Sequence, residues 1–278
     1  MHLKIRPAIT LLYFISFLSL SNLAFAYSDD WRNEFKNGFV KGFTNPESIE
    51  NKIDLMGLRG EQRTIARNYL NELTTNEKFI DYMVDAYLTA PFMKEFTEGR
   101  LDNEALYMHA IRFSYEVEAD LSLRGLQRLS DENVKAFLAI MVNIFSKIEP
   151  EYCRSLAGFE PTSQMQEISA SLIMLQSLDE RNLRAYLRLN KLAINSELND
   201  FPIVQNFNDY QLEQANLAFE NSLINAYQRY GSPGFLEALA DPDAASDEDI
   251  CLSMMLTMQV AHDMEGITGK WMRAMFFR

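Results

Sequence analysis

The chain has 278 residues, of which 47% are hydrophobic, and carries 26 basic against 39 acidic side chains, a formal net charge of −13. The large apolar fraction excludes a disordered chain, and the acidic charge disfavours nucleic acids and anionic membrane surfaces, which it would repel. The same charge attracts a basic protein partner or a cationic ligand, or simply keeps the protein soluble. Glycine and proline number only 11 and 8, and long runs of Leu, Met, Ala, Glu and Asn favour helix over sheet.

Residues 1–26 have the pattern of a cleavable export signal. Lys4 and Arg6 form a short positive start, and residues 9–20 are an apolar run broken by three hydroxyl residues. Ala24-Phe25-Ala26 then has the small-x-small pattern that a signal peptidase cuts after. An apolar run of about a dozen residues is too short to cross a hydrocarbon core of roughly 30 Å as a helix. The segment therefore predicts export and no membrane anchor.

Cleavage is expected between Ala26 and Tyr27, so that the mature chain comprises residues 27–278. It would hold 24 basic against 39 acidic residues, a net charge of −15. Its 252 residues suffice for one large helical domain or for two small ones that share a core. We predict a periplasmic or secreted protein with no transmembrane span in the mature chain.

The first predicted helix covers residues 29–43 and carries an aromatic stripe. Trp31, Phe35, Phe39 and Phe43 recur every four residues, so they stay close to one face of the helix. A stripe of this kind is typical of a face buried in a core. It could instead be a hydrophobic arm that binds a partner protein, and the pattern leaves both alternatives open.

The rest of the chain is predicted as a succession of helices separated by Gly, Pro and Asn breaks. Pro91 is expected to kink or break one of them, and Ser130 and Ser246 are plausible N-caps. The expected helices cover about 47–56, 61–73, 76–98, 102–120 before a turn at Gly125, 131–148, a short helix at Cys153, 164–177, 180–197, 209–230, a helix through Cys251 that ends near Gly266, and 267–277. The sequence thus predicts an all-α domain of about ten to thirteen helices with no strand.

Two segments, residues 133–138 and 182–187, match position by position in residue type. Each follows a leucine and an acidic first turn, and the two lie 49 residues apart. They would be consistent with a repeated helical hairpin, as in α-solenoids. Because helix starts share composition, an unrelated pair of helices explains the likeness equally well.

The chain has two cysteines, Cys153 and Cys251. In an exported protein a single pair of thiols predicts one disulfide. A redox pair and two buried free thiols are the alternatives, but there is no Cys-x-x-Cys motif to support redox chemistry. The bridge would leave no thiol free to act as a nucleophile.

No pattern of catalytic, cofactor-binding or metal-ligating residues is convincing. His262 and Glu265 lie one turn apart, but a dinuclear metal bundle needs a second such pair, which His109 does not supply. His109 shares a helix face with Arg112 and Glu116, which is better explained as a solvated face. The acidic stretch 241–249 lacks the order of a calcium loop. Gly-x-Ser-x-Gly, His-Glu-x-x-His, P-loop and Gly-x-Gly-x-x-Gly motifs are absent.

The C-terminal stretch is apolar and basic in an otherwise acidic chain. Trp271 and Phe276 lie in it, and the segment either packs on the body of the protein or meets a partner. With the aromatic stripe of residues 29–43, it forms the set of possible partner-binding residues.

The favoured interpretation is an exported, non-catalytic protein that binds another protein, such as an inhibitor, an immunity-type protein or a chaperone-like accessory. The alternative is a helical protein that binds a small apolar ligand or lipid, which a closed apolar cavity would favour. An enzyme is the third hypothesis and requires His109 or His262 in a cleft among carboxylates.

Overall fold

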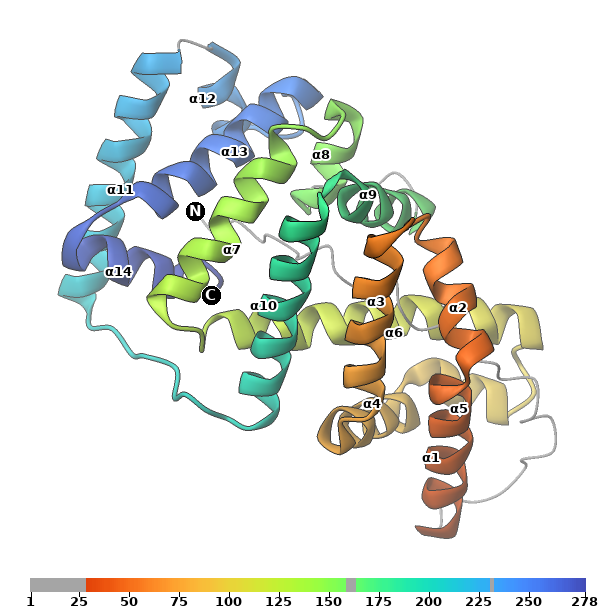
Figure 1. Cartoon of the computed structure of the whole chain (residues 1–278). Coiled ribbons are helices and arrows are strands. Elements are labelled where there is room, and N and C mark those ends of the chain that lie inside the picture. Colours follow the sequence, from red (N-terminus) through yellow and green to blue (C-terminus); the bar gives the residue numbers. More distant parts are fainter. Residues whose placement is uncertain (1–28, 159–163, 231–232) are drawn as a thin grey trace. The chain divides into compact units, whose positions relative to one another are not determined.

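The computed structural model describes residues 29–158, 164–230 and 233–278. They form fourteen α-helices and no strand (Figure 1), so the predicted all-α class is confirmed. The expected export signal, with its cleavage site at Ala26 and Tyr27, lies outside the described residues. The helices are α1 Asp29–Thr44, α2 Pro46–Leu55, α3 Glu61–Thr74, α4 Glu77–Thr89, α5 Pro91–Thr97, α6 Asn103–Leu126, α7 Asp131–Phe145, α8 Pro150–Leu156, α9 Gln164–Ser177, α10 Glu180–Leu198, α11 Asp209–Tyr230, α12 Pro233–Ala240, α13 Asp247–Asp263 and α14 Gly266–Met275.

Prolines begin two helices: Pro91 breaks the helix expected over 76–98, as predicted, and Pro233 begins a short helix that was not expected. Within the expected helix 76–98, Ala90 is extended (ψ 135°) and Pro91 is the first residue of α5. This follows because proline restricts the residue before it to extended conformations and suits the first helical position. A further short helix, α12, begins at Pro233.

Helix α6 continues past residue 120, through the turn expected at Gly125. A Cβ on Gly125 would lie 2.0 Å from the carbonyl oxygen of Ala193, so the glycine permits close approach to α10 and does not mark a turn. The hydroxyl of Ser122 also donates a hydrogen bond to Asn190 on α10, and both side chains are fully buried. Packing therefore extends this helix.

The chain divides into two compact units, with the boundary inside α6 between Asp120 and Leu121. In the first unit, residues 29–120, α1 contacts α2, α3 and α4, and α4 contacts α5. An aromatic cluster forms its core: the ring centroid of Tyr87 lies 5.6 Å from that of Phe39 and 5.2 Å from that of Phe113. The α1 stripe thus packs directly on α4.

Helix α13 is the centre of the second unit, which the structure describes within Leu121–Arg278. It contacts α7, α8, α11, α12 and α14, and Figure 1 shows it running between α7 and α11. A helix with neighbours on so many sides must be apolar around most of its circumference. Its buried apolar residues are Ile250, Cys251, Met254, Leu256, Met258, Val260 and Ala261.

The guanidinium of Arg273 on α14 ties three helix ends together. It donates hydrogen bonds of 2.6 and 3.1 Å to the carboxylate of Asp131, in the first turn of α7. It also donates to the carbonyls of Ala261 (3.0 Å) and Met264 (2.7 Å) at the end of α13. The side chain is only 2% exposed. These bonds satisfy carbonyls that a helix C-terminus leaves without partners.

A buried cluster of polar and ionisable side chains lies in the first unit. It consists of Lys52 on α2, Tyr69 on α3 and Glu118 on α6. The hydroxyl of Tyr69 donates a 3.1 Å hydrogen bond to Oε1 of Glu118. Burial raises the pKa of Glu118 to about 8 and lowers the pKa of Lys52 to about 8, because removal from water disfavours the charged form of each.

The matching segments 133–138 and 182–187 have the same local structure. Ser130 and Asp179 cap the two helices by accepting hydrogen bonds from the backbone N–H of Asn133 and Asn182. Equivalent aromatic residues of the two segments then stack, because the ring centroids of Phe137 and Tyr186 lie 6.0 Å apart. The likeness is therefore that of two capped helix starts that pack against each other.

Replacement of Arg273 by Met is expected to lower the free energy of unfolding by about 2–4 kcal/mol, because the carbonyls of Ala261 and Met264 would lose their buried donor and Asp131 would lose its ion pair. Lys270→Met, at an exposed position of the same helix, should change it by less than about 0.5 kcal/mol. The double variant Arg273→Met/Asp131→Leu should recover part of the loss. Urea unfolding measures all three, and equal values for Arg273→Met and Lys270→Met would contradict the role of this side chain.

Burial of Glu118 predicts that stability falls as pH rises from about 4.5 to about 8. With its pKa raised to about 8 from 4.5, the folded protein holds a proton in this window that the unfolded chain has released, and folding loses this advantage as pH rises. The decrease should be about 4–5 kcal/mol.

Urea unfolding at a series of pH values should show this decrease for the unaltered protein and for Glu116→Gln, an exposed neighbour, but not for Glu118→Gln. Lys52 acts in the opposite sense only above pH 8, where its lowered pKa favours the folded state. An unchanged slope in Glu118→Gln would show that another group is responsible.

Candidate binding surface

Exposed apolar side chains are concentrated on one stretch of the second unit. Six of the eight large apolar residues that the structure describes as exposed lie between residues 201 and 230. We define the 201–224 surface by five of them: Phe201 and Ile203, which lie in the connection between α10 and α11 (residues 199–208), and Tyr210, Leu217 and Ile224, which lie on α11.

The backbone of the α10–α11 connection is held from two sides. Arg128 donates hydrogen bonds to Glu197 (2.6 Å), to Asp200 (2.8 Å) and to the carbonyl of Pro202 (3.1 Å). Farther along, Arg278 donates to the carbonyl of Gln205, and its guanidinium lies 4.9 Å from the centroid of the Phe207 ring.

Between these anchors, the side chains of Phe201 and Ile203 remain 70% and 83% exposed. An ordered backbone that keeps two large apolar side chains in water is unusual for a connection. The bonds from Arg128 therefore fix the backbone that carries the exposed side chains of Phe201 and Ile203.

The apolar residues on α11 form a line along its outer side. Seven residues are nearly two full helical turns, so Tyr210, Leu217 and Ile224 lie one above another. The opposite side, at Ala215 and Phe219, is buried, where α11 contacts α13 and α14. We call Tyr210, Leu217 and Ile224 the outer stripe of α11.

Two exposed glutamates accompany the outer stripe. Glu213 and Glu220 follow Tyr210 and Leu217 by three residues, which places them beside the stripe on the helix surface. Neither forms a hydrogen bond or ion pair within the described residues. The outer side of α11 therefore offers apolar contact together with unneutralised negative charge.

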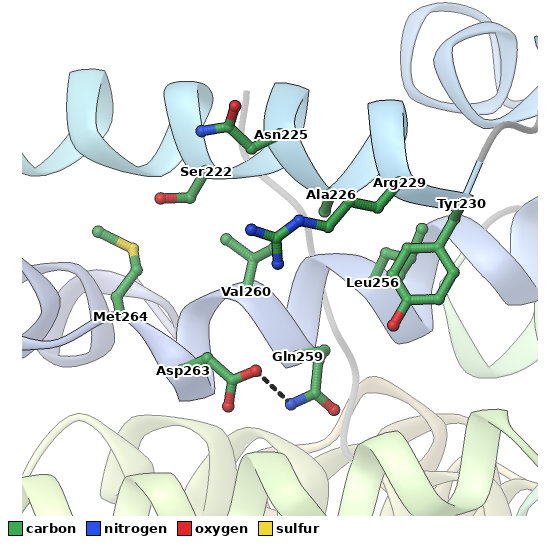
Figure 2. A pocket seen from close by; sticks show the side chains of 10 residues that line it. All are labelled: Ser222, Asn225, Ala226, Arg229, Tyr230, Leu256, Gln259, Val260, Asp263 and Met264. Atoms are coloured by element: carbon green, nitrogen blue, oxygen red, sulfur yellow. Dashed lines mark hydrogen bonds between the residues drawn. The ribbon is translucent and has the colours of Figure 1, made fainter.

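A shallow cleft of about 260 Å³ lies between α11 and α13. Its lining includes Ala226, Val260 and Met264, and Figure 2 shows the Arg229 side chain extending from α11 toward α13. The amide of Gln259 donates a 2.6 Å hydrogen bond to Asp263. The cleft opens to solvent and is smaller than the roughly 300–1,000 Å³ of typical ligand pockets, so it is not a closed apolar cavity.

Of the six residues that the sequence suggested for partner binding, the four with described side chains differ in their burial. Phe35 and Phe39 are each 2% exposed, so the core-face alternative applies to them and they offer no surface. Phe276 is also buried, with its ring centroid 6.3 Å from that of Phe219 on α11, while Trp271 is half-buried on α14. The side chains of Trp31 and Phe43 lie outside the described residues.

The two histidines of the described chain lie apart from any cluster of ligands. His109 is exposed on α6 and stacks on Phe92, with ring centroids 5.8 Å apart. His262 is half-buried, and its Nδ1 lies 2.7 Å from the carboxylate of Asp263. Within the part of the chain that the structure describes, no three His, Cys, Asp or Glu side chains are grouped as a metal site would require.

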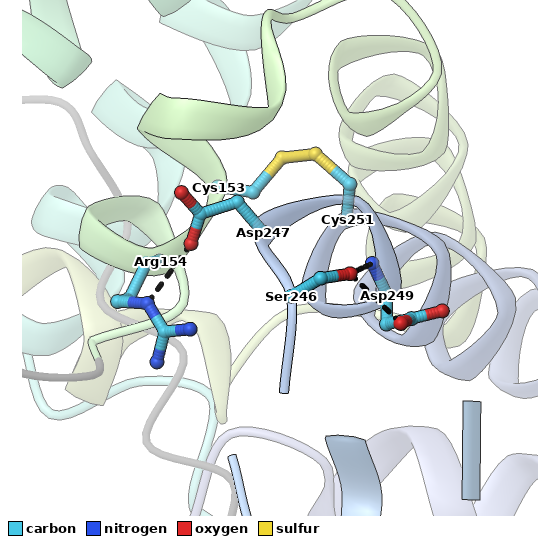
Figure 3. The surroundings of a disulfide bond; sticks show 6 residues. All are labelled: Cys153, Arg154, Ser246, Asp247, Asp249 and Cys251. Carbon is cyan, nitrogen blue, oxygen red and sulfur yellow. Dashed lines mark hydrogen bonds and ion pairs between the residues drawn. A yellow bond between two sulfur atoms is a disulfide. The ribbon is translucent and has the colours of Figure 1, made fainter. Parts of the chain in front are cut away.

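The predicted disulfide between Cys153 on α8 and Cys251 on α13 is confirmed, with the two Cα atoms 5.2 Å apart. Figure 3 shows Arg154 beside it, paired with Asp247 at 3.0 Å. Arg154 also donates to the carbonyls of Pro242 (2.8 Å) and Ala245 (2.7 Å). The bridge and this arginine together fasten the start of α13 and the acidic loop before it to α8.

The sequence did not predict the 201–224 surface, because one apolar residue in every seven is a weak signal beside the inner apolar side of the same helix.

Comparison with protein-family models, curated proteins and solved structures finds no match. In the described part of the chain, no helix has both the length and the apolar character needed to cross a membrane.

Loss of the disulfide is expected to lower the free energy of unfolding by about 4–5 kcal/mol, because an unfolded chain without the 98-residue loop closure gains entropy. The variant Cys153→Ser/Cys251→Ser and the reduced protein should show the same decrease in urea unfolding. A reductant should leave the double variant unaffected. Two free thiols in denatured, unreduced protein would contradict the bridge.

Proposed function

We propose that this chain is an exported, non-catalytic protein that binds another protein through the 201–224 surface. The observation that carries the proposal is the exposure of Phe201 and Ile203 on a backbone held by Arg128. Apolar side chains on a preorganised backbone bind with little loss of conformational freedom, and their burial by a partner is favourable.

The acidic charge supports a basic partner. The net charge of −13 speeds association with a positively charged protein and opposes association with an anionic one. Glu213 and Glu220 add such charge beside the outer stripe itself.

Export is supported by two independent features. Residues 1–26 carry the signal pattern, and disulfides are typical of oxidising compartments such as the periplasm. An inhibitor, an immunity-type protein and a chaperone-like accessory are the classes that an exported acidic binding protein of this kind would fit.

Photo-crosslinking tests the proposal in the cells that make the protein. Benzoylphenylalanine is placed at Ile203 or Leu217 and, as matched controls, at Leu55 or Ile267, which are also exposed apolar positions, 48% and 58% accessible. We expect one adduct of the same mass from Ile203 and Leu217 and none from Leu55 or Ile267. The same adducts from all four positions, or none from the first two, would contradict the proposal.

A further inference from the structure

We infer that the outer side of α11 binds a basic, amphipathic helix of the partner protein. This inference rests on the proposed function and specifies the chemistry of its partner. It follows from the combination on one helix face of a straight apolar line and two carboxylates that no described residue neutralises.

The geometry of the outer stripe matches a helix. Tyr210 and Ile224 are 14 residues apart, or about 21 Å along the axis at 1.5 Å per residue. A second helix that lies along this line buries its own apolar residues against the stripe when they recur every three and four positions. Helix α11 already uses its other side, at Ala215 and Phe219, within the protein, so only its outer side is available.

Charge distinguishes the occupant. Glu213 and Glu220 lie beside the stripe at the positions that flank the apolar contact in paired helices, where a partner Lys or Arg forms an ion pair. The one basic residue of α11, Arg229, lies in its last turn and lines the cleft on the side toward α13.

Other acids of the described residues are neutralised internally, in contrast to Glu213 and Glu220. Glu50 accepts hydrogen bonds from Arg63 and Arg67, and Glu197 pairs with Arg124 and Arg128. A second copy of the chain is a poor occupant, because its α11 would bring like charges together and both copies are strongly acidic.

The probe is an 18-residue helical peptide in which Leu recurs at alternating spacings of three and four residues and every other position is Lys. It is compared with a peptide in which every Lys is replaced by Glu. Fluorescence anisotropy with the purified protein should show binding of the basic peptide alone, weakened by added salt. Glu213→Lys/Glu220→Lys should weaken that binding by about ten-fold or more, because two attractive pairs become repulsive.

The matched control is Asp241→Lys/Asp243→Lys, which changes the net charge equally at two exposed positions of the acidic loop and should alter binding by less than about two-fold. Leu217→Ser should weaken binding, whereas Leu55→Ser on α2 should not. Circular dichroism shows whether each variant keeps its helices. We expect that it does, because the substituted positions are exposed and Lys and Ser are tolerated there.

Equal loss of binding in both charge-reversal variants would show attraction by net charge alone and would overturn the inference. So would a failure of the basic peptide to bind, or a dimer in sedimentation velocity that Glu213→Lys/Glu220→Lys alters. If the adducts from Ile203 and Leu217 form while the two peptides bind alike, the basic helix is wrong and protein binding stands.

Discussion

The buried guanidinium of Arg273 sets the arrangement of the second unit. It satisfies the last carbonyls of α13 and the charge of Asp131 together, so α7, α13 and α14 meet at one point. The disulfide and Arg154 fasten the other end of α13. Because α11 packs on α13 and α14, its inner side is occupied, and its outer stripe is left facing water.

Among the described residues, several ion pairs join separate segments of the chain, and none lies on the outer side of α11. Arg128 neutralises acids of two segments that it holds together, Glu197 of α10 and Asp200 of the connection that follows it. The acids on the outer side of α11 have no such partner within the described residues. Exposed ion pairs add little to stability, so the stronger consequence of the unpaired acids is a local negative field at this face.

Burial decides the behaviour of the charged residues of the first unit. Lys52 lies in a short helix whose sequence reads as an ordinary surface element, and nothing in that pattern marks this lysine as fully buried. The packing of α2 and α3 with α6 encloses it with Glu118, and removal from water then shifts both pKa values. A periodicity argument has no access to this, because the shift depends on neighbours from distant parts of the chain.

Local physics accounts for what could be predicted without coordinates. The helices, the N-caps at Ser130 and Ser246 and the break at Pro91 depend on neighbouring residues alone, and two cysteines allow a single intrachain bridge. Whether the Phe35–Phe39 face is core or contact surface, how far α6 runs past Gly125, and which side of α11 faces water were decided by packing. These outcomes depend on which helices pack against each other. An apolar side chain gains from burial in any well-packed contact, so its type does not identify its neighbour, and only the tertiary arrangement does.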